Sequence, residues 1–211
     1  FKSFADAEIT VLCVDFYNGD YTAEVAERNF DALGNIMGVT DRTDVIIQWY
    51  SDAIDDVMSV IDTIPESEKG KTVYYEVTTS DGSTYGRVVG MGTNDVTAVG
   101  AVNVLDGGVD MNWDDDKMMA ANPDVIIIAT TGYFGATQYF GYGQNPTQDQ
   151  LDSMVSSFES RNIWDELTAV QNGAVEFRYG EFRNTPAGIY DLTATAKLVY
   201  PEYFEGVDPV S

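Results

Sequence analysis

The sequence predicts an α/β protein built on a largely parallel β-sheet. From residue 71 onward, segments with strand composition alternate with segments of helical periodicity, as in parallel strands joined by crossover helices. The segment 123–130 contains the unbroken apolar run VIIIA, as expected of a strand covered on both faces. A long amphipathic helix predicted over 40–65 separates this part from a shorter strand–helix unit.

The first 40 residues predict one strand followed by one helix. The segment 8–16, EITVLCVDF, is short, rich in apolar residues and bounded by polar ones, as expected of a buried strand. The segment 22–38 has apolar residues near helical spacing, Thr22 as a candidate N-cap and Gly38 as a candidate stop. This unit is too small to be a domain alone, and we interpret it as the end of another α/β lobe.

The segment 40–65 is the clearest element of the sequence. Its apolar residues recur at three- and four-residue steps and form one stripe, and Pro65 ends the helix. The stripe consists of Ile46, Trp49, Tyr50, Ala53, Ile54, Val57, Met58, Ile61 and Ile64. About 22 helical residues span 33 Å, which is long for a helix that covers one sheet and suits a helix that braces two lobes.

Between residues 71 and 130 we predict two strands with short helices between them. The segment 71–79, KTVYYEVTT, predicts a strand, and the polar turn SDGST follows it. Short helices are predicted over 93–104 and 112–122, the second with aspartates in its first turn, where the helix dipole favours them. The segment 123–130 predicts a fully buried strand, which we expect to be parallel.

The last third of the chain continues the alternation. A helix is predicted over 147–160, where Thr147 and Gln150 fit a capping box. A helical turn over 164–173 ends at Gly173, the segment 174–180 predicts a strand, and a final helix over 186–204 stops at Pro201.

The charge balance excludes one class of partner. The 211 residues carry 35 acidic and 11 basic side chains, for a net charge of −24 spread along the whole chain. Nucleic-acid binding needs a basic footprint, so we expect none. Repulsion between acidic surfaces instead indicates a protein kept soluble in a salty or extracellular setting. Because the chain begins at Phe1 and not at Met, we also expect a processed or trimmed piece of a longer product.

The residue inventory argues against an enzyme. Histidine is absent, which removes the commonest general base, and no GxSxG, P-loop or GxGxxG motif is present. Cys13 lies in an apolar run and is expected to be a small buried residue. The run DDD at 114–116 leaves open an α/β enzyme that uses a hard metal at this acidic cluster, against the alternative of a solvated first helical turn.

The candidate site lies at the carboxyl ends of the predicted strands, where open parallel sheets bind ligands. Aromatic residues follow each strand, and two of the three loops also carry an arginine. These residues are Tyr133 and Phe134 after 123–130, Phe182 and Arg183 after 174–180, and Tyr85 and Arg87 after 71–79. Such a set suits a planar or anionic ligand, through stacking and bidentate hydrogen bonds. The alternative is that the aromatic rings only pack the loops and that Arg183 pairs with a nearby acid.

Several segments resemble a known family. MNWDDDKMMAANPDVIII, IWDELTAVQNGAVEF and PAGIYDLTATAKLVYPEYF occur in the order and spacing of the carboxyl-terminal half of ABC-transporter substrate-binding proteins for ferric siderophores, haem and cobalamin. FDALGNIMG at 30–38 is similar to the family's segment before its long helix, and GAVNVLDGG at 100–108 is similar to its GG.N segment. The resemblance covers essentially the whole chain.

The resemblance implies a Rossmann-like carboxyl-terminal lobe of a two-lobe binding protein. Residues 1–40 would be the end of the amino-terminal lobe, 41–64 the inter-lobe bridging helix, and 65–211 the carboxyl-terminal α/β lobe. Most of the amino-terminal lobe would be missing from this chain. The family location implies an extracellular or periplasmic protein, membrane-anchored at full length.

The resemblance also implies partners and site residues. The ligand would be an iron–siderophore or a related haem or cobalamin chelate, bound without a cofactor by Tyr133, Phe134, Arg178 and Arg183, and the partner an ABC transporter permease. An acid that pairs with permease arginines would fall at Asp116, with Asp114 crowding it. The glycine- and tyrosine-rich loop 132–146 is longer than the family pattern and would reshape the pocket or form a lid. A ligand-free surface or assembly module remains a third hypothesis, because a missing lobe would leave apolar surface exposed.

Overall fold

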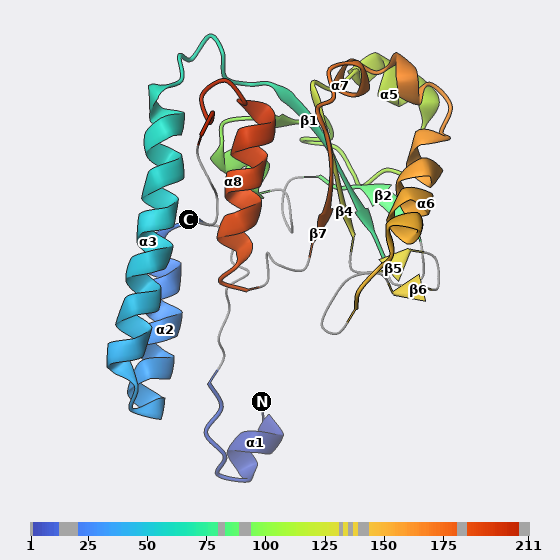
Figure 1. The fold of residues 1–211 in the computed structure, drawn as a ribbon. Coiled ribbons are helices and arrows are strands. Elements are labelled where there is room, and N and C mark those ends of the chain that lie inside the picture. The colour runs from blue at the N-terminus through green and yellow to red at the C-terminus, as the bar shows by residue number, and fades with distance from the viewer. Residues whose placement is uncertain are drawn as a thin grey trace.

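The computed structural model describes residues 2–12, 21–79, 83–88, 94–130, 133–134, 137–138, 144–180 and 185–206. An α/β layer lies beside a pair of long antiparallel helices, and a short helix, α1 (Lys2–Asp6), lies below them (Figure 1).

The largely parallel sheet predicted from the sequence is confirmed. The three strands β1 (Thr72–Thr78), β4 (Val125–Thr130) and β7 (Val175–Tyr179) run parallel in that spatial order. The short strand β2 (Thr84–Gly86) pairs antiparallel with the end of β1, and β3 (Val102–Asn103) pairs parallel with its start. Beyond β4, two strands of two residues each, β5 (Tyr133–Phe134) and β6 (Thr137–Gln138), pair antiparallel and form a hairpin.

Helices cover both faces of the sheet (Figure 1). On one face, α5 (Asp115–Ala121), α6 (Gln148–Glu159), the 3-10 turn η1 (Trp164–Glu166) and α7 (Thr168–Gln171) enclose a core around Tyr74, Ile126 and Ile128. On the other, α3 (Thr40–Thr63), α4 (Asn94–Ala98) and α8 (Gly188–Val199) enclose a core around Tyr75 and Ile127. The alternation of side chains along each strand therefore feeds two separate cores.

The helix α2 (Ala23–Met37) and the long helix α3 form a tight hairpin. Gly38 ends α2 in the left-handed conformation, with φ of 67°, as the sequence predicted. Gly34 lies against Thr43 of α3, so that a Cβ at this position would collide with the threonine side chain. The lack of a side chain at Gly34 thus sets how closely the two helices approach.

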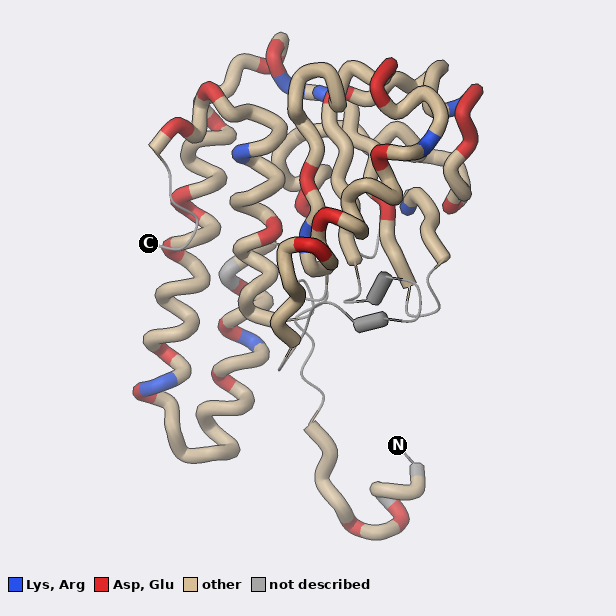
Figure 2. Tube along the Cα trace, turned by 45° about the vertical axis from the view of Figure 1, so that its right-hand side comes forward, with Lys and Arg blue, Asp and Glu red and all other residues tan. Residues whose placement is uncertain are grey.

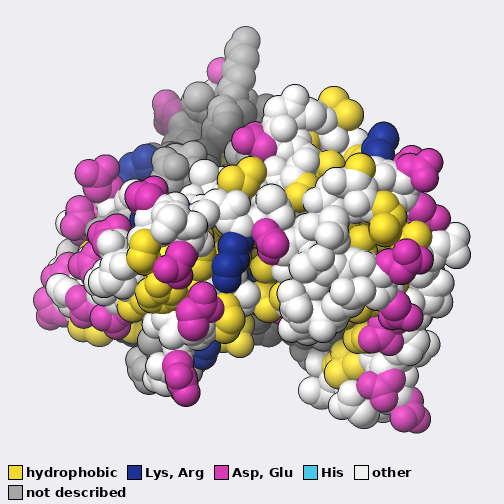
Figure 3. Space-filling view, turned by 90° about the horizontal axis from the view of Figure 1, so that it is seen from above, with side chains coloured by type: hydrophobic (Ala, Val, Ile, Leu, Met, Phe, Trp, Pro, Cys, Tyr) yellow, Lys and Arg dark blue, Asp and Glu magenta, His cyan; other side chains and the backbone are white. Residues whose placement is uncertain are grey.

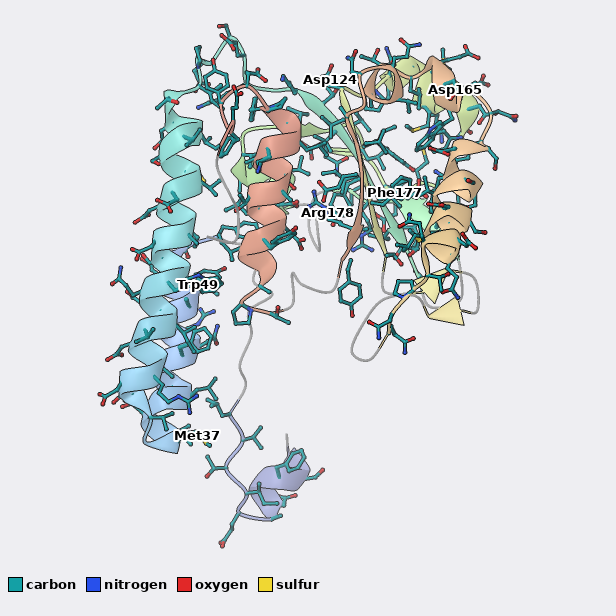
Figure 4. All side chains as sticks on the ribbon, in the orientation of Figure 1. Met37, Trp49, Asp124, Asp165, Phe177 and Arg178 are labelled. Carbon is teal, nitrogen blue, oxygen red and sulfur yellow. The ribbon has the colours of Figure 1, made fainter. Side chains whose placement is uncertain are left out.

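Only part of the predicted stripe of α3 is buried. Tyr50, Ile54, Val57 and Ile61 are buried, in agreement with the sequence, whereas Trp49 is 49% exposed. In Figure 4, Trp49 lies about midway along α3, and Met37 lies at the tip of the hairpin. Trp49 was therefore wrongly predicted as part of the buried stripe, because it is turned outward at a position where its neighbour Tyr50 packs into the core.

Some predicted boundaries were wrong. No strand forms at residues 8–12, where Ile9 is 54% exposed; the remainder of the predicted strand 8–16, with Cys13, lies outside the described residues. The helix predicted over 93–104 ends at Ala98, because Gly100 adopts a left-handed conformation with φ of 74° and the chain then enters β3. The final helix ends at Val199, two residues before Pro201.

Of the two helix N-caps predicted from the sequence, only the one at α6 makes side-chain hydrogen bonds. Thr147 and Gln150 form the predicted capping box at the start of α6. Thr22 occupies the N-cap of α2 but makes no side-chain capping hydrogen bond.

Acidic residues are distributed over all parts of the fold, with few basic residues between them (Figure 2). The sequence has 35 acidic and only 11 basic residues, so the cations are too few to pair with most of the acids. The folded state therefore confines many like charges in a small volume, which destabilises it through self-repulsion.

We expect salt to stabilise this protein. Raising NaCl from 0.1 M to 1 M shortens the Debye length from about 10 Å to 3 Å and so screens the repulsion between acidic side chains. The melting temperature, followed by circular dichroism, should rise by at least about 3 °C, which corresponds to roughly 1 kcal/mol in a domain of this size. A melting temperature that stays constant or falls over this range would contradict the prediction.

Candidate functional site

The carboxyl ends of the three parallel strands meet at one edge of the sheet. Thr78, Thr130 and Tyr179, the last residues of β1, β4 and β7, lie in register with one another. Thr84 of β2 pairs with Thr78 on its other side, so four hydroxyl side chains form a row on one face of this edge. Sequence reasoning did not single out this row, although each strand visibly ends in a threonine or tyrosine.

Two of the predicted ligand residues follow directly from this edge. Tyr133 and Phe134 form β5, which pairs with Gln138 and Thr137, and the hairpin lies at the lower end of the sheet in Figure 1. The structure describes the backbone of this hairpin and not its side chains. Phe182 and Arg183 lie outside the described residues, as do the aromatic residues at 139, 140 and 142.

Tyr85 lies one position from the same edge. It pairs with Val77 of β1, and its half-buried ring packs against the core under α3 and α8. Its hydroxyl accepts a hydrogen bond from Arg87 Nη1 at 3.2 Å, and the Arg87 guanidinium lies 5.5 Å from the centre of its ring. Tyr85 and Arg87, which the sequence placed in one loop, are thus brought into contact.

Arg178 points into the fold. Its side chain is 5% exposed; Nη1 donates to Asp95 Oδ2 at 3.0 Å and to Thr195 Oγ1 at 2.9 Å, and Nε donates to Glu176 at 2.8 Å. Figure 4 shows Arg178 and Phe177 on opposite sides of β7, with Arg178 toward α8. These contacts hold β7 to α4 and α8, and they are the contacts of a structural ion pair.

Asp95 is a buried carboxylate at the centre of this network. Thr195 hydrogen-bonds to it, and its side chain is 3% exposed. Burial raises the pKa of Asp95 above its usual value, whereas Arg178, Thr195 and the backbone N–H of Val96 stabilise the carboxylate and oppose that rise. The ion pair with Arg178 is therefore what makes a charge acceptable at this position.

A second buried ion pair lies on the other face of the sheet, the face that carries the row of hydroxyl side chains. Glu76 of β1 is fully buried and accepts two hydrogen bonds from Arg161, at 2.8 and 2.5 Å. The Arg161 guanidinium also lies 4.5 Å from the ring centre of Trp113 and 4.6 Å from that of Phe158, and it reaches Thr84 Oγ1 at 3.4 Å. Sequence reasoning missed this pair, although a glutamate inside the apolar strand TVYYEVT is a signal for a buried charge.

The acidic run 114–116 begins α5, at the other end of the molecule from β5 (Figure 1). Asp114 caps the helix by accepting from Lys117 N at 2.9 Å, and Asp115 accepts from Trp113 Nε1 at 2.9 Å and from Asn162 at 3.2 Å. Asp116 is exposed. Figure 3, which looks onto this end of the molecule, shows many acidic and few basic side chains.

Within the described residues, no group of three or more carboxylate, cysteine or histidine side chains is placed to hold a metal ion. No helix in the described part of the chain is both long and apolar enough to cross a membrane.

Comparison with known proteins gives one consistent result. A family model described as "Periplasmic binding protein" matches residues 6–177, and no curated protein matches. The crystal structure of a TroA-like periplasmic binding protein, FepB from Veillonella parvula, has a TM-score of 0.82 at 22% identity, covering 99% of this chain. A periplasmic haem-binding protein from Pseudomonas aeruginosa has a TM-score of 0.69 at 16% identity, covering all of this chain and 69% of its own.

A possible iron-binding periplasmic protein from Staphylococcus epidermidis has a TM-score of 0.61 at 17% identity, covering 94% of this chain and 69% of its own. These likenesses establish the shared fold. The chain spans 60% of the length of the Veillonella protein, which makes it comparable to a part of that protein.

The structural assignment of Arg178 can be tested directly. Arg178→Met should lower the free energy of unfolding by about 3–5 kcal/mol, because it leaves the Asp95 carboxylate buried without a partner. Urea denaturation measures this loss, and the double variant with Asp95→Asn should recover most of it. A single variant as stable as the parent protein would show that Arg178 is free to serve another purpose.

Proposed function

Because this chain belongs to the periplasmic binding protein family, whose model matches residues 6–177, we propose that it is the solute-binding component of an ABC importer. It binds an iron–siderophore or a related iron or tetrapyrrole chelate between two lobes and delivers it to the permease. In this proposal residues 1–40 end the amino-terminal lobe, 41–64 form the bridging helix and 65–211 form the carboxyl-terminal lobe. The protein binds its ligand without chemical conversion.

The observation that carries the proposal is the convergence of three strand ends at one edge of the sheet. Thr78, Thr130 and Tyr179 lie in register, so the loops that contain the predicted ligand residues all leave from the same place. Ligands of open α/β sheets bind at this edge. The buried Glu76–Arg161 pair, two positions from the end of β1, supports a rigid base for such a site.

The proposed ligand contacts are divided between stacking and charge. Tyr133, Phe134 and Phe182 supply aromatic faces to a planar ligand, and Arg183 pairs with its acidic groups. Because the Arg178 side chain pairs with the buried Asp95, we propose that it holds β7 in place and does not contact the ligand. The similarity of the fold to that of the haem-binding protein from Pseudomonas aeruginosa supports a metal chelate as the ligand class.

Exposed apolar residues on the hairpin support the two-lobe arrangement. Val45 of α3 is 68% exposed, and Trp49 of the same helix is 49% exposed. In this proposal the amino-terminal lobe covers them and forms the opposite wall of the cleft. The family also supports an extracellular or periplasmic location, and we propose a membrane anchor for the full-length protein.

A titration tests the ligand assignment. The full-length protein is mixed with ferric siderophores, haem and cobalamin in turn, and tryptophan fluorescence is followed. We expect a saturable change with one of these chelates. Arg183→Ala should then weaken the binding of an anionic chelate about tenfold, since a charged hydrogen bond contributes roughly 1.5 kcal/mol.

The matched control for this variant is Lys117→Ala, which removes the same charge at the other end of the sheet and should leave the affinity unchanged. No response to any chelate would refute the ligand class. A response that is equally sensitive to both substitutions would show that net charge, and not the strand-end site, governs binding.

The proposed contact of Asp116 and Asp114 with the permease can be tested separately from ligand binding. In vesicles that contain the permease, Asp116→Asn and Asp114→Asn should each slow chelate import about two- to fivefold, the range for exposed ion pairs, without changing chelate affinity. Asparagine is also a good N-cap, so Asp114→Asn preserves the start of α5. Asp149→Asn, an exposed acid on α6, is the control, and equal slowing by it would contradict the docking assignment.

A further inference from the structure

The strand β7 forms a side edge of the sheet that no other described strand covers. In the sheet order β2-β1-β4-β7, it has a neighbour on one side only. Every residue of β4 is buried, whereas the residues of β7 are half-buried with the exception of Arg178. An edge of this kind presents backbone groups with which a further strand can pair.

The outward backbone groups of β7 belong to Val175 and Phe177. Ile126 N of β4 donates to Ala174 O at 3.0 Å, and alternate residues continue this parallel ladder, so the even-numbered residues of β7 bond to β4. The N–H and C=O of Val175 and Phe177 therefore point to the other side, where the described part of the chain places no strand. The geometry of these groups suits an extended segment and not a helix or a small solute.

A groove of about 610 Å³ lies between this edge and α8. Glu176 and Arg178 line it from β7, and Tyr190, Ala194 and Lys197 line it from one face of α8. The small side chain of Ala194 lies between the two long ones along this face. The groove thus leaves room for the side chains of an added strand on the α8 side of the sheet.

The opposite face of the edge is apolar. The half-buried side chains of Val175 and Phe177 pack against the core around Ile128, and the Phe177 ring lies 5.5 Å from that of Phe158. An aromatic side chain beside Phe177 on an added strand would extend this core.

The sequence of β7, VEFRY, is complementary to itself in antiparallel pairing. With Phe177 of two copies facing each other, Glu176 of each copy lies opposite Arg178 of the other, and Val175 lies opposite Tyr179. Facing aromatic residues and facing opposite charges both stabilise antiparallel strands. Glu176 is still 25% exposed although it accepts from Arg178 Nε at 2.8 Å, so its carboxylate is open to a second contact.

The charge of the groove selects the same partner. Two acids, Glu176 and Asp191, and two cations, Arg178 and Lys197, line it, although the chain as a whole has 35 acidic and 11 basic residues. A strongly charged strand gains nothing from such a balanced lining, whereas a second β7 brings one acid and one cation. The net charge of −24 on each copy opposes their approach, and salt screens that repulsion.

We propose that β7 pairs antiparallel with β7 of a second copy of this chain, about a two-fold axis at Phe177, once salt screens the net charge. The two sheets then form one continuous sheet. The proposal does not rest on the proposed function, because it concerns the side edge of the sheet and not the loops that follow the strands.

Cysteine cross-linking under air oxidation in 1 M NaCl tests the register. All variants carry Cys13→Ser, which removes the only cysteine of the chain. Phe177→Cys should form a disulfide-linked dimer, because facing Cα atoms lie about 5.5 Å apart, within disulfide range. Val175→Cys alone should not, because its two copies lie more than about 13 Å apart, but a mixture of Val175→Cys with Tyr179→Cys should.

Analytical ultracentrifugation measures the pairing without a disulfide. The parent chain at submillimolar concentration should be monomeric in 0.1 M NaCl and form dimers in 1 M NaCl, where the Debye length falls to about 3 Å. Glu176→Lys places like charges opposite each other in both facing pairs and should raise the dimer dissociation constant about tenfold. Glu159→Lys makes the same charge change at an exposed position on α6 and is the matched control.

Three results would each overturn the proposal. The first is a chain that stays monomeric at both salt concentrations, which would leave the edge to a different partner. The second is cross-linking of Val175→Cys alone, or cross-linking of the mixture no greater than that of Asp149→Cys, an exposed control on α6. The third is an equal effect of Glu176→Lys and Glu159→Lys. If circular dichroism shows that Phe177→Cys does not fold, the mixture and the charge variants decide.

Discussion

The burial of β4 on both faces is the constraint on which the rest of the structure depends. Ile126, Ile127 and Ile128 are at most 2% exposed, and they alternate between two cores. One core requires α5 and α6 on one face of the sheet, and the other requires α3 and α8 on the opposite face (Figure 1). A strand covered in this way must be joined to its neighbours by crossovers, which makes them parallel and brings their carboxyl ends to one edge. The position of the candidate site follows from the packing of apolar side chains.

Two buried ion pairs, one on each face, fix how the helical layers sit on this sheet. Glu76 of β1 pairs with Arg161 after α6, and Arg178 of β7 pairs with Asp95 of α4. The chain has few cations, and it places two of its six arginines here. Such pairs add little net stability compared with apolar residues, but a buried charge without its partner is strongly unfavourable. A slip of one residue in β1 or β7 would turn the charge to the wrong face, so the pairs favour the native register.

The two proposed contact surfaces lie on different parts of the lobe. The proposed ligand site uses the carboxyl ends of the strands, whereas the proposed docking acids Asp114 and Asp116 lie at the start of α5, at the opposite end of the α/β layer (Figure 1). They share no side chain. A protein that must hold a solute and also touch a membrane partner gains from this separation, because neither contact excludes the other.

The sequence by itself determined the class of fold and the long helix, and it predicted that the carboxyl ends of the strands meet at one edge of the sheet. Hydrophobic periodicity and the apolar run of β4 are local signals, and they predicted the parallel sheet and the bounds of α3 to within two residues. The sequence could not determine which way the Arg178 side chain points, because Asp95, a residue 83 positions earlier in the chain, turns that side chain inward. The same holds for Glu76 and Arg161, which are 85 positions apart in the chain. Such contacts join distant segments, and only the packed tertiary structure decides which side chains meet across them.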